Sequence, residues 1–339
     1  MRGASNAVKA SFAAAVLLLV TACSDDGAPR DELQLVENPT AASPASSPEQ
    51  EDTPDGRLLD VDGDVTCVAV NQGTLAAAVT GDDGDTEVLF YRLAQPTKAP
   101  KRVDVDGPVE RLTVSDDQFA ATVPSENTVL YLTLGGVVGK TSIGGAPTSI
   151  AELDGTTLVG LRKAKAVAVL EHEQQTSRTS GELASADQVL VSSGGAAVVL
   201  DRLRSALFEV QTGEADIGLG LRAGQGATNA VTDAYNRVLV VDTREEYLLA
   251  FSLDPLVLRQ RYPVPGGPYG IAYDPKQDLA WVTLTARNEV VAFDVAGGEP
   301  EEAARFSTVR QPNAVTTDPT TGTVVVASGD GEGIQVIEP

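Results

Sequence analysis

Short apolar runs recur throughout residues 57–339, and Gly, Asp, Asn and Pro residues interrupt them. No stretch in this range repeats its apolar residues with the period of an amphipathic helix, whereas β-branched residues are frequent within the runs. The alternation of short apolar segments with turn-forming residues predicts an all-β domain.

A repeat of about forty residues organises these runs. Pro268 matches Pro312, and the Asp274-Pro275 turn matches Asp318-Pro319, in both cases 44 residues apart (312 − 268 and 318 − 274). Each unit is expected to hold four strands, and four antiparallel strands in about forty residues make one blade of a β-propeller. The units begin near residues 63, 106, 144, 181, 222, 265 and 310. In the sixth unit the expected strands are 268–273, 278–284, 289–294 and 302–309.

The seventh unit reaches Pro339 with only three expected strands, which would leave an open sheet edge. Residues 57–61 precede the first unit and resemble 102–105, the expected outer strand of unit one. We therefore expect residues 57–61 to supply the missing strand and to close a seven-bladed β-propeller. A ring of six or eight blades, a solenoid and two stacked sandwiches are the alternative architectures.

The sixth unit also carries a family resemblance. Its segments 263–272, 279–283 and 288–294 resemble the YVTN repeat of bacterial propellers, and Trp281-Val282-Thr283 stands where that motif has Tyr-Val-Thr. Units five and seven fit the motif loosely, and units one to four only in outline. The resemblance implies a YVTN- or NHL-type propeller of the quinoprotein and lactonase-like superfamily, displayed at a cell surface.

The first 22 residues have the pattern of an export signal. Arg2 and Lys9 precede the apolar run 12–20, which is too short to span a bilayer as a helix. The residues after this run, Val20-Thr21-Ala22-Cys23, resemble the lipobox of bacterial lipoproteins. The resemblance implies cleavage before Cys23 and acylation of its thiol with palmitate-type chains that anchor the protein to the cell membrane. An ordinary signal peptide and an uncleaved anchor are the alternatives.

Residues 24–56 are rich in Asp, Glu, Ser, Ala and Pro and show no apolar periodicity. Such a segment buries too little surface to offset the entropy lost on ordering, so it predicts a disordered tether. The expected organisation is a signal peptide over 1–22, a lipidated Cys23 with its tether over 23–56, and the propeller domain over 57–339.

The formal net charge of the chain is −23 at pH 7. Removal of the signal takes away two cations and no acid, so the mature chain is still more negative. This charge argues against a nucleic-acid partner, because phosphate contacts need clustered cations, and it favours a monomer. The second cysteine, Cys67, lies in the apolar run 65–70, where we expect a small core residue and no disulfide.

Several motifs that would carry chemistry are incomplete. The single histidine, His172, falls in the outer half of a blade, so a Ser-His-Asp triad has no base at the channel, and His-rich zinc or haem sites are excluded. The glycines around 135–141 lack P-loop spacing, because Leu134 stands where the first Gly belongs. Residues 60–64 and 81–85 are similar to calcium loops without an EF-hand frame. We expect no metal and no cofactor, with calcium in these loops as the alternative.

The loops at one face of the expected ring carry the candidate binding residues. In a propeller, the hairpins between second and third strands share the channel mouth with the links between blades. In units three to six the hairpins hold seven cations, which are Arg162, Lys163, Lys165, Arg202, Arg204, Arg244 and Arg287. In units seven, one and two they hold acids instead: Asp330, Glu332, Asp82, Asp83, Asp85 and Glu126. Asn229 and Asn313 occupy equivalent positions in units five and seven, beside Tyr269 of unit six.

These features favour a non-catalytic function. The expected protein is an extracytoplasmic lipoprotein that binds a protein, a glycan or a small anionic ligand through the loop face of its propeller. The alternative is a lactonase-type or other hydrolase with an active site at the channel mouth. Such an enzyme needs a channel cluster of Glu, Asn, Asp or Arg, often with a metal, and the sequence offers only the two asparagines.

Overall fold

The computed structural model describes residues 37–213 and 216–339. These residues form 28 β-strands and one short 3-10 helix, Pro124–Glu126. The predicted export signal and Cys23 lie outside the described residues. Within the described ranges no helix is long and apolar enough to cross a membrane. The all-β class expected from the sequence is confirmed.

The strands follow one another in antiparallel groups of four, which we call blades. Blade 1 holds β2 (Asp64–Asn71), β3 (Thr74–Thr80), β4 (Thr86–Arg92) and β5 (Lys101–Val105). Blade 2 holds β6 (Arg111–Ser115), β7 (Gln118–Val123), β8 (Thr128–Thr133) and β9 (Gly136–Ser142). Blade 3 holds β10 (Pro147–Leu153), β11 (Thr156–Leu161), β12 (Ala166–Glu171) and β13 (Gln174–Ser180). Blade 4 holds β14 (Gln188–Val191), β15 (Ala197–Asp201), β16 (Ala206–Gln211) and β17 (Asp216–Arg222).

The second half of the chain continues the series. Blade 5 holds β18 (Ala227–Thr232), β19 (Arg237–Asp242), β20 (Tyr247–Ser252) and β21 (Val257–Pro263). Blade 6 holds β22 (Pro268–Asp274), β23 (Leu279–Leu284), β24 (Glu289–Asp294) and β25 (Glu301–Ser307). Blade 7 holds β26 (Pro312–Thr317), β27 (Val324–Ser328), β28 (Ile334–Ile337) and β1 (Arg57–Leu59). The four strands of blade 6 lie within two residues of their predicted bounds.

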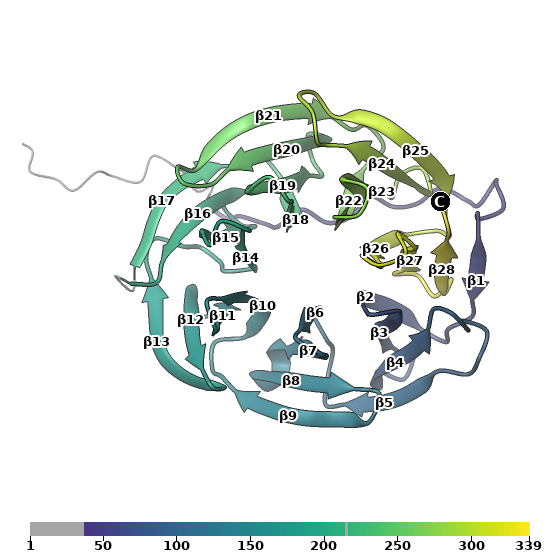
Figure 1. The fold of residues 1–339 in the computed structure, drawn as a ribbon, viewed down its shortest axis with the longest axis horizontal. Helices are drawn as coiled ribbons and strands as arrows, with labels where there is room; N and C mark the ends of the chain where they lie inside the picture. The colour runs from purple at the N-terminus through teal and green to yellow at the C-terminus, as the bar shows by residue number, and fades with distance from the viewer. Residues whose placement is uncertain (1–36, 214–215) are drawn as a thin grey trace, which may run out of the picture. The chain divides into compact units, whose positions relative to one another are not determined.

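The blades form a ring around a central axis, with the first strand of each blade innermost and the last strand outermost (Figure 1). Five blades are separate four-stranded sheets, and blades 3 and 4 join into an eight-stranded sheet. A single parallel pair between their outer strands, Ser180 with Asp216, makes this junction. The arrangement is that of a β-propeller, as the repeat predicted.

Apolar side chains fill the space between neighbouring blades. The middle strands are buried on both faces, as in β3, whereas outer strands such as β25 are largely exposed. Seven hydrophobic clusters each join two adjacent blades, and the one shared by blades 7 and 1 completes the circuit. Because each blade has one apolar face against each neighbour, the continuous apolar runs of the sequence belong in the middle strands.

The ring closes through a strand from the beginning of the domain. β1 pairs antiparallel with β28, and Leu59 lies opposite Ile334. Gly56 precedes β1 with a φ of +75°, and a Cβ there would clash with the carbonyl oxygen of Val336, so only glycine fits. The prediction that residues 57–61 close the last blade is confirmed for the strand Arg57–Leu59.

Candidate binding site at the channel mouth

One face of the ring gathers the loops that the sequence predicted at the channel mouth. Antiparallel pairing brings the end of each second strand, the start of each third strand and the start of each first strand to the same side. In blade 2, for example, Arg111 at the start of β6 pairs with Thr122 near the end of β7. We call this side the mouth face.

A cavity of about 440 Å³ lies where the inner strands meet the mouth face. Residues of β2, β6, β18, β22 and β26 line it, together with Arg202 from the hairpin between β15 and β16. Four of the predicted binding residues contribute to its wall, namely Arg202, Asn229, Tyr269 and Asn313. The structure thus brings one cation of the predicted arc together with both asparagines and the tyrosine.

Arg111 is the cavity residue that sequence reasoning missed. Its Nη2 donates to Oδ1 of Asn229 at 3.4 Å, while its Nε is buried and has no hydrogen-bond partner among the described residues. Burial lowers the pKa of Arg111, and nearby Arg202 lowers it further, whereas Glu110 acts in the opposite direction. A guanidinium that is desolvated beside a second cation is held at a cost in free energy.

Arg202 is the second cation in the cavity wall. Its Nη2 donates to the carbonyl oxygen of Ala42 at 2.8 Å, and its backbone N–H donates to Asp187 at 2.9 Å. Its Nε is buried and, like that of Arg111, has no partner in the described part of the chain. Two guanidinium groups with an unsatisfied donor therefore contribute to one cavity.

Arg162 is committed to an internal network at the edge of the mouth. Its Nη2 lies 2.6 Å from Oε1 of Glu110 and its Nε lies 2.6 Å from Oδ1 of Asp187. Burial alone would lower the pKa of Arg162, but hydrogen bonds and attraction to the two carboxylates outweigh it and raise the pKa. The network ties blades 2, 3 and 4 together, so the structure assigns Arg162 a role in joining blades.

The remaining predicted cations do not form one free surface. Arg204 is buried, donates to the carbonyl of Glu182 and stacks over the ring of Phe208 at 5.2 Å. Arg244 donates to the carbonyl oxygens of Gln225 and Thr40. The exposed members of the predicted arc are Lys163, Lys165, Arg244 and Arg287. The sequence located the cations on the mouth face but gave no sign of the internal acceptors that several of them use.

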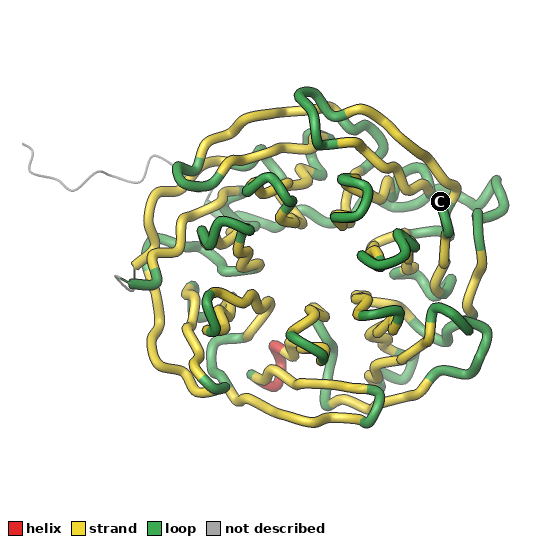
Figure 2. Tube along the Cα trace, viewed as in Figure 1, coloured by secondary structure: helices red, strands yellow, loops and turns green. Residues whose placement is uncertain are grey.

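Residues 40–50 lie against the mouth face, and we call this segment the strap. Its carbonyl groups accept hydrogen bonds from side chains of successive blades: Arg244 reaches Thr40, Arg202 reaches Ala42, Gln311 reaches Ala45, and Asn288 and Arg310 reach Pro48. Figure 2 draws the strap as loop throughout, and in Figure 1 it passes behind β18 and β22 toward β1.

The strap departs from the disordered tether expected over 23–56. Ala42 in the strap is only 4% exposed, and beyond the strap Asp55 donates its N–H to the carbonyl oxygen of Ser307. The order has a physical cause that composition does not reveal: the segment forms no sheet, but long polar side chains of blades 4 to 7 satisfy its carbonyl groups. Residues 23–36 of the predicted tether lie outside the described residues.

Cys67 also lines the cavity and is not the core residue that its apolar run predicted. It is half-buried at the channel wall and packs against the cluster between blades 1 and 2. Burial raises the pKa of its thiol to about 12, so the group stays neutral at physiological pH. His172 lies in the exposed turn between β12 and β13 and does not line the cavity.

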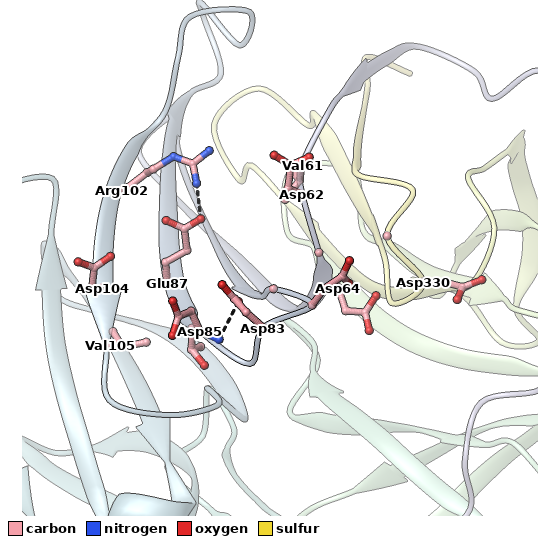
Figure 3. Close-up of a pocket in the computed structure, with 15 residues that line it drawn as sticks. Val61, Asp62, Asp64, Asp83, Asp85, Glu87, Arg102, Asp104, Val105 and Asp330 are labelled. Atoms are coloured by element: carbon pink, nitrogen blue, oxygen red, sulfur yellow. Dashed lines mark hydrogen bonds and ion pairs between the residues drawn. The ribbon is translucent and has the colours of Figure 1, made fainter.

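An acidic groove of about 1160 Å³ occupies the region of blades 7 and 1 (Figure 3). Glu87 is paired with Arg102, and Asp83 accepts the backbone N–H of Asp85 at 3.1 Å. Its carboxylates are Asp62, Asp64, Asp82, Asp83, Asp85, Glu87, Asp104 and Asp330. Within residues 37–213 and 216–339, no three His, Cys, Asp or Glu side chains converge as metal ligands. The groove includes residues of both loops that resemble calcium loops, but with no coordinating cluster.

No protein-family model matches the chain, and no curated protein sequence matches it. Several solved structures, in contrast, are similar to the chain. Hydrazine synthase of Kuenenia stuttgartiensis is similar with a TM-score of 0.70 and 14% identity, over 85% of this chain and 99% of that one. A catalytically inactive virginiamycin B lyase from Staphylococcus aureus with quinupristin has a TM-score of 0.69 and 13% identity, over 83% and 97%. A chain of a mitotic checkpoint complex has a TM-score of 0.70 and 11% identity, over 90% and 98%. At these identities the likeness shows the β-propeller fold.

Proposed function

We propose that this protein is an extracytoplasmic, lipid-anchored binding protein that holds a small anionic ligand in the cavity at its channel mouth. The observation that carries the proposal is the pair Arg111 and Arg202, each of which has a buried Nε without a hydrogen-bond partner among the described residues. Both residues line the same cavity, and no carboxylate is paired with either of them by an ion pair in the described part of the chain.

The physical case starts from the cost of burying a charge. Arg111 and Arg202 are partly buried, and a buried N–H without an acceptor costs free energy; an anion in the cavity is attracted by the two positive charges and offsets part of that cost. Guanidinium groups match carboxylate and phosphate oxygens in geometry, because planar N–H donors can bind two oxygens side by side. A small ligand with a carboxylate or phosphate group is therefore the class that this cavity fits.

One of the two carboxylates in the cavity wall is already paired with a cation. Asp64 and Glu110 are the acids in its wall, and Glu110 already accepts two hydrogen bonds from Arg162. Arg162 thereby neutralises Glu110, so this carboxylate repels a bound anion less. The same pairing disfavours a hydrolase, because a carboxylate held by a guanidinium is a weak general base. Binding without catalysis is the function that this geometry supports best.

The anchor rests on the sequence. Val20-Thr21-Ala22-Cys23 resembles a lipobox, and the apolar run 12–20 before it is typical of export signals. Two or more acyl chains hold a protein stably on a membrane, whereas one holds it marginally. In this proposal the propeller stands outside the cytoplasm and remains attached to the membrane through Cys23.

Calorimetric titration with sulfate, phosphate and citrate tests the binding site. We expect at least one of these anions to bind the wild-type chain and Arg111→Gln to weaken that binding about tenfold to a hundredfold. This range corresponds to a charge-assisted hydrogen bond of about 1.5–3 kcal/mol. Arg287→Gln is the matched control, because Arg287 is exposed on the mouth face and does not line the cavity. Equal loss in both variants, or no binding of any of the three anions, would overturn the proposal.

A further inference from the structure

The strap contacts two cavity-lining residues, Arg202 directly and Asn313 through Gln311. Arg202 lines the cavity and donates from Nη2 to the carbonyl oxygen of Ala42 at 2.8 Å, while its Nε is buried without a partner among the described residues. On blade 7, Nε2 of Gln311 donates to the carbonyl oxygen of Ala45 at 2.9 Å and to Oδ1 of Asn313 at 3.0 Å. The first contact is with a residue that lines the cavity, and the second reaches the lining residue Asn313 through Gln311.

Ser47 fixes the strap at its contact with Gln311. Its Oγ accepts from the backbone N–H of Gln311 and donates to the carbonyl oxygen of Thr285, both at 2.7 Å. Its own N–H donates to Oε1 of Gln311 at 3.2 Å. The neighbouring Ser46 is exposed and makes no hydrogen bond to the described residues. One serine of the pair is therefore an attachment point, and the other is not.

We infer that the strap is part of the anion site: it positions Arg202 and Asn313, so that ligand binding and strap docking stabilise each other. This inference rests on the proposed function. An arginine has several rotatable bonds, and the fixed Nη2 of Arg202 removes much of the side-chain entropy that the ligand would otherwise have to overcome. A released strap leaves both Arg202 and Gln311 free to turn toward solvent.

Thermodynamic linkage makes the effect reciprocal. If the docked strap raises the affinity for the anion by a given factor, the bound anion favours the docked strap by the same factor. Couplings of this kind are commonly between about 5-fold and 150-fold. Because the strap lies between Cys23 and the propeller in the sequence, occupancy of the cavity influences how much of the chain separates the domain from its anchor.

The test compares Ser47→Ala with Ser46→Ala in the full-length chain in detergent, with citrate as the probe. Citrate affinity is measured by calorimetry. Strap release is measured as the rate of elastase cleavage after Ala42 and Ala45, because elastase accepts small side chains at the cleaved bond. We expect Ser47→Ala to bind citrate about fivefold or more weakly and to be cleaved faster, whereas Ser46→Ala behaves as wild type. We also expect saturating citrate to slow cleavage of the wild-type chain.

The outcomes separate the inference from the function on which it rests. If wild type binds citrate but cleavage is unchanged at saturation, or if both serine variants bind equally well, the strap is not part of the site and anion binding stands. If citrate, sulfate and phosphate all fail to bind wild type, both proposals are wrong. A slower cleavage that also appears in Arg111→Gln at the same citrate concentration identifies a general salt effect and overturns the coupling.

Discussion

The closure of the ring can be tested with one pair of neighbouring leucines. Leu59 is 5% exposed and belongs to the hydrophobic cluster between blades 7 and 1, whereas Leu58 is 47% exposed on the other side of the same strand. Leu59→Ala removes buried methyl groups and leaves a cavity, which costs about 2–5 kcal/mol in protein cores. β1 has only three residues and can shift to fill part of that space, so we expect about 2–3 kcal/mol.

The assay is urea denaturation followed by the fluorescence of Trp281, the single tryptophan of the chain. Trp281 is 0% exposed and packs in the cluster between blades 6 and 7, so its emission reports on the part of the ring next to the closure. We expect Leu59→Ala to lower the transition midpoint with an unchanged slope, which indicates a loss of stability without a change in the surface exposed on unfolding.

Leu58→Ala is the matched control and should change the free energy of unfolding by no more than about 0.5 kcal/mol. The two variants differ by one position on one strand, so they also test the register of β1 against β28. A shift of one residue would exchange the buried and exposed faces. If Leu58→Ala destabilises as much as Leu59→Ala, or if neither moves the midpoint, the closure described here is wrong.

Three further predictions follow from individual side chains. Because the pKa of Cys67 is raised from 9.0 to about 12, alkylation by iodoacetamide at pH 8, followed by mass spectrometry, should be about a thousandfold slower in the folded than in the unfolded chain. Equal alkylation rates in the folded and unfolded chains would refute the raised pKa. Because the folded pKa is the higher one, the neutral thiol contributes to the free energy of unfolding below pH 9, and this contribution is lost as the pH rises toward 12. Arg162→Glu should lower the melting temperature strongly, because it places a third carboxylate between Glu110 and Asp187; an unchanged melting temperature contradicts the network. Cys23→Ala should release the protein from membranes or leave the precursor uncleaved, and unchanged partition and processing on an immunoblot would count against the anchor.

The fold was largely predictable because it repeats. The spacing of Pro268 from Pro312 and of Asp274 from Asp318 marks the same turn in two blades, and strand positions follow from that phase. Ring closure was predictable because residues 57–61 match the outer strand of another blade. Both inferences compare short segments of one repeat with those of another. In a repeat protein such comparisons predict the positions of the strands.

The binding site was only partly predictable, because it depends on partners far apart in the chain. Arg111 follows Glu110, and adjacent opposite charges at the start of a strand are typical of a solvated surface; only the placement of β6 at the channel turns Arg111 into a cavity residue. Arg202 and Ala42 are separated by 160 residues, so no local pattern signals their hydrogen bond. The composition of a segment indicates how much surface that segment can bury by itself. It does not indicate that its carbonyl groups will accept hydrogen bonds from side chains far away in the sequence.

The pairing of β1 with β28 has a consequence for how the protein is made. Leu59 and Ile334 are partners although they are 275 positions apart (334 − 59), so the first strand can pair only after the last strand has been synthesised. Such long-range pairing is slow to form, because a large loop has to close before the contact is gained. In an exported chain, β1 would leave the translocation machinery first and stay unpaired until residue 337 has followed. Once β28 has emerged, its outer edge can mispair with other chains until β1 pairs with it. For an exported chain, as proposed above, the stage just before the ring closes should therefore be the one most exposed to mispairing.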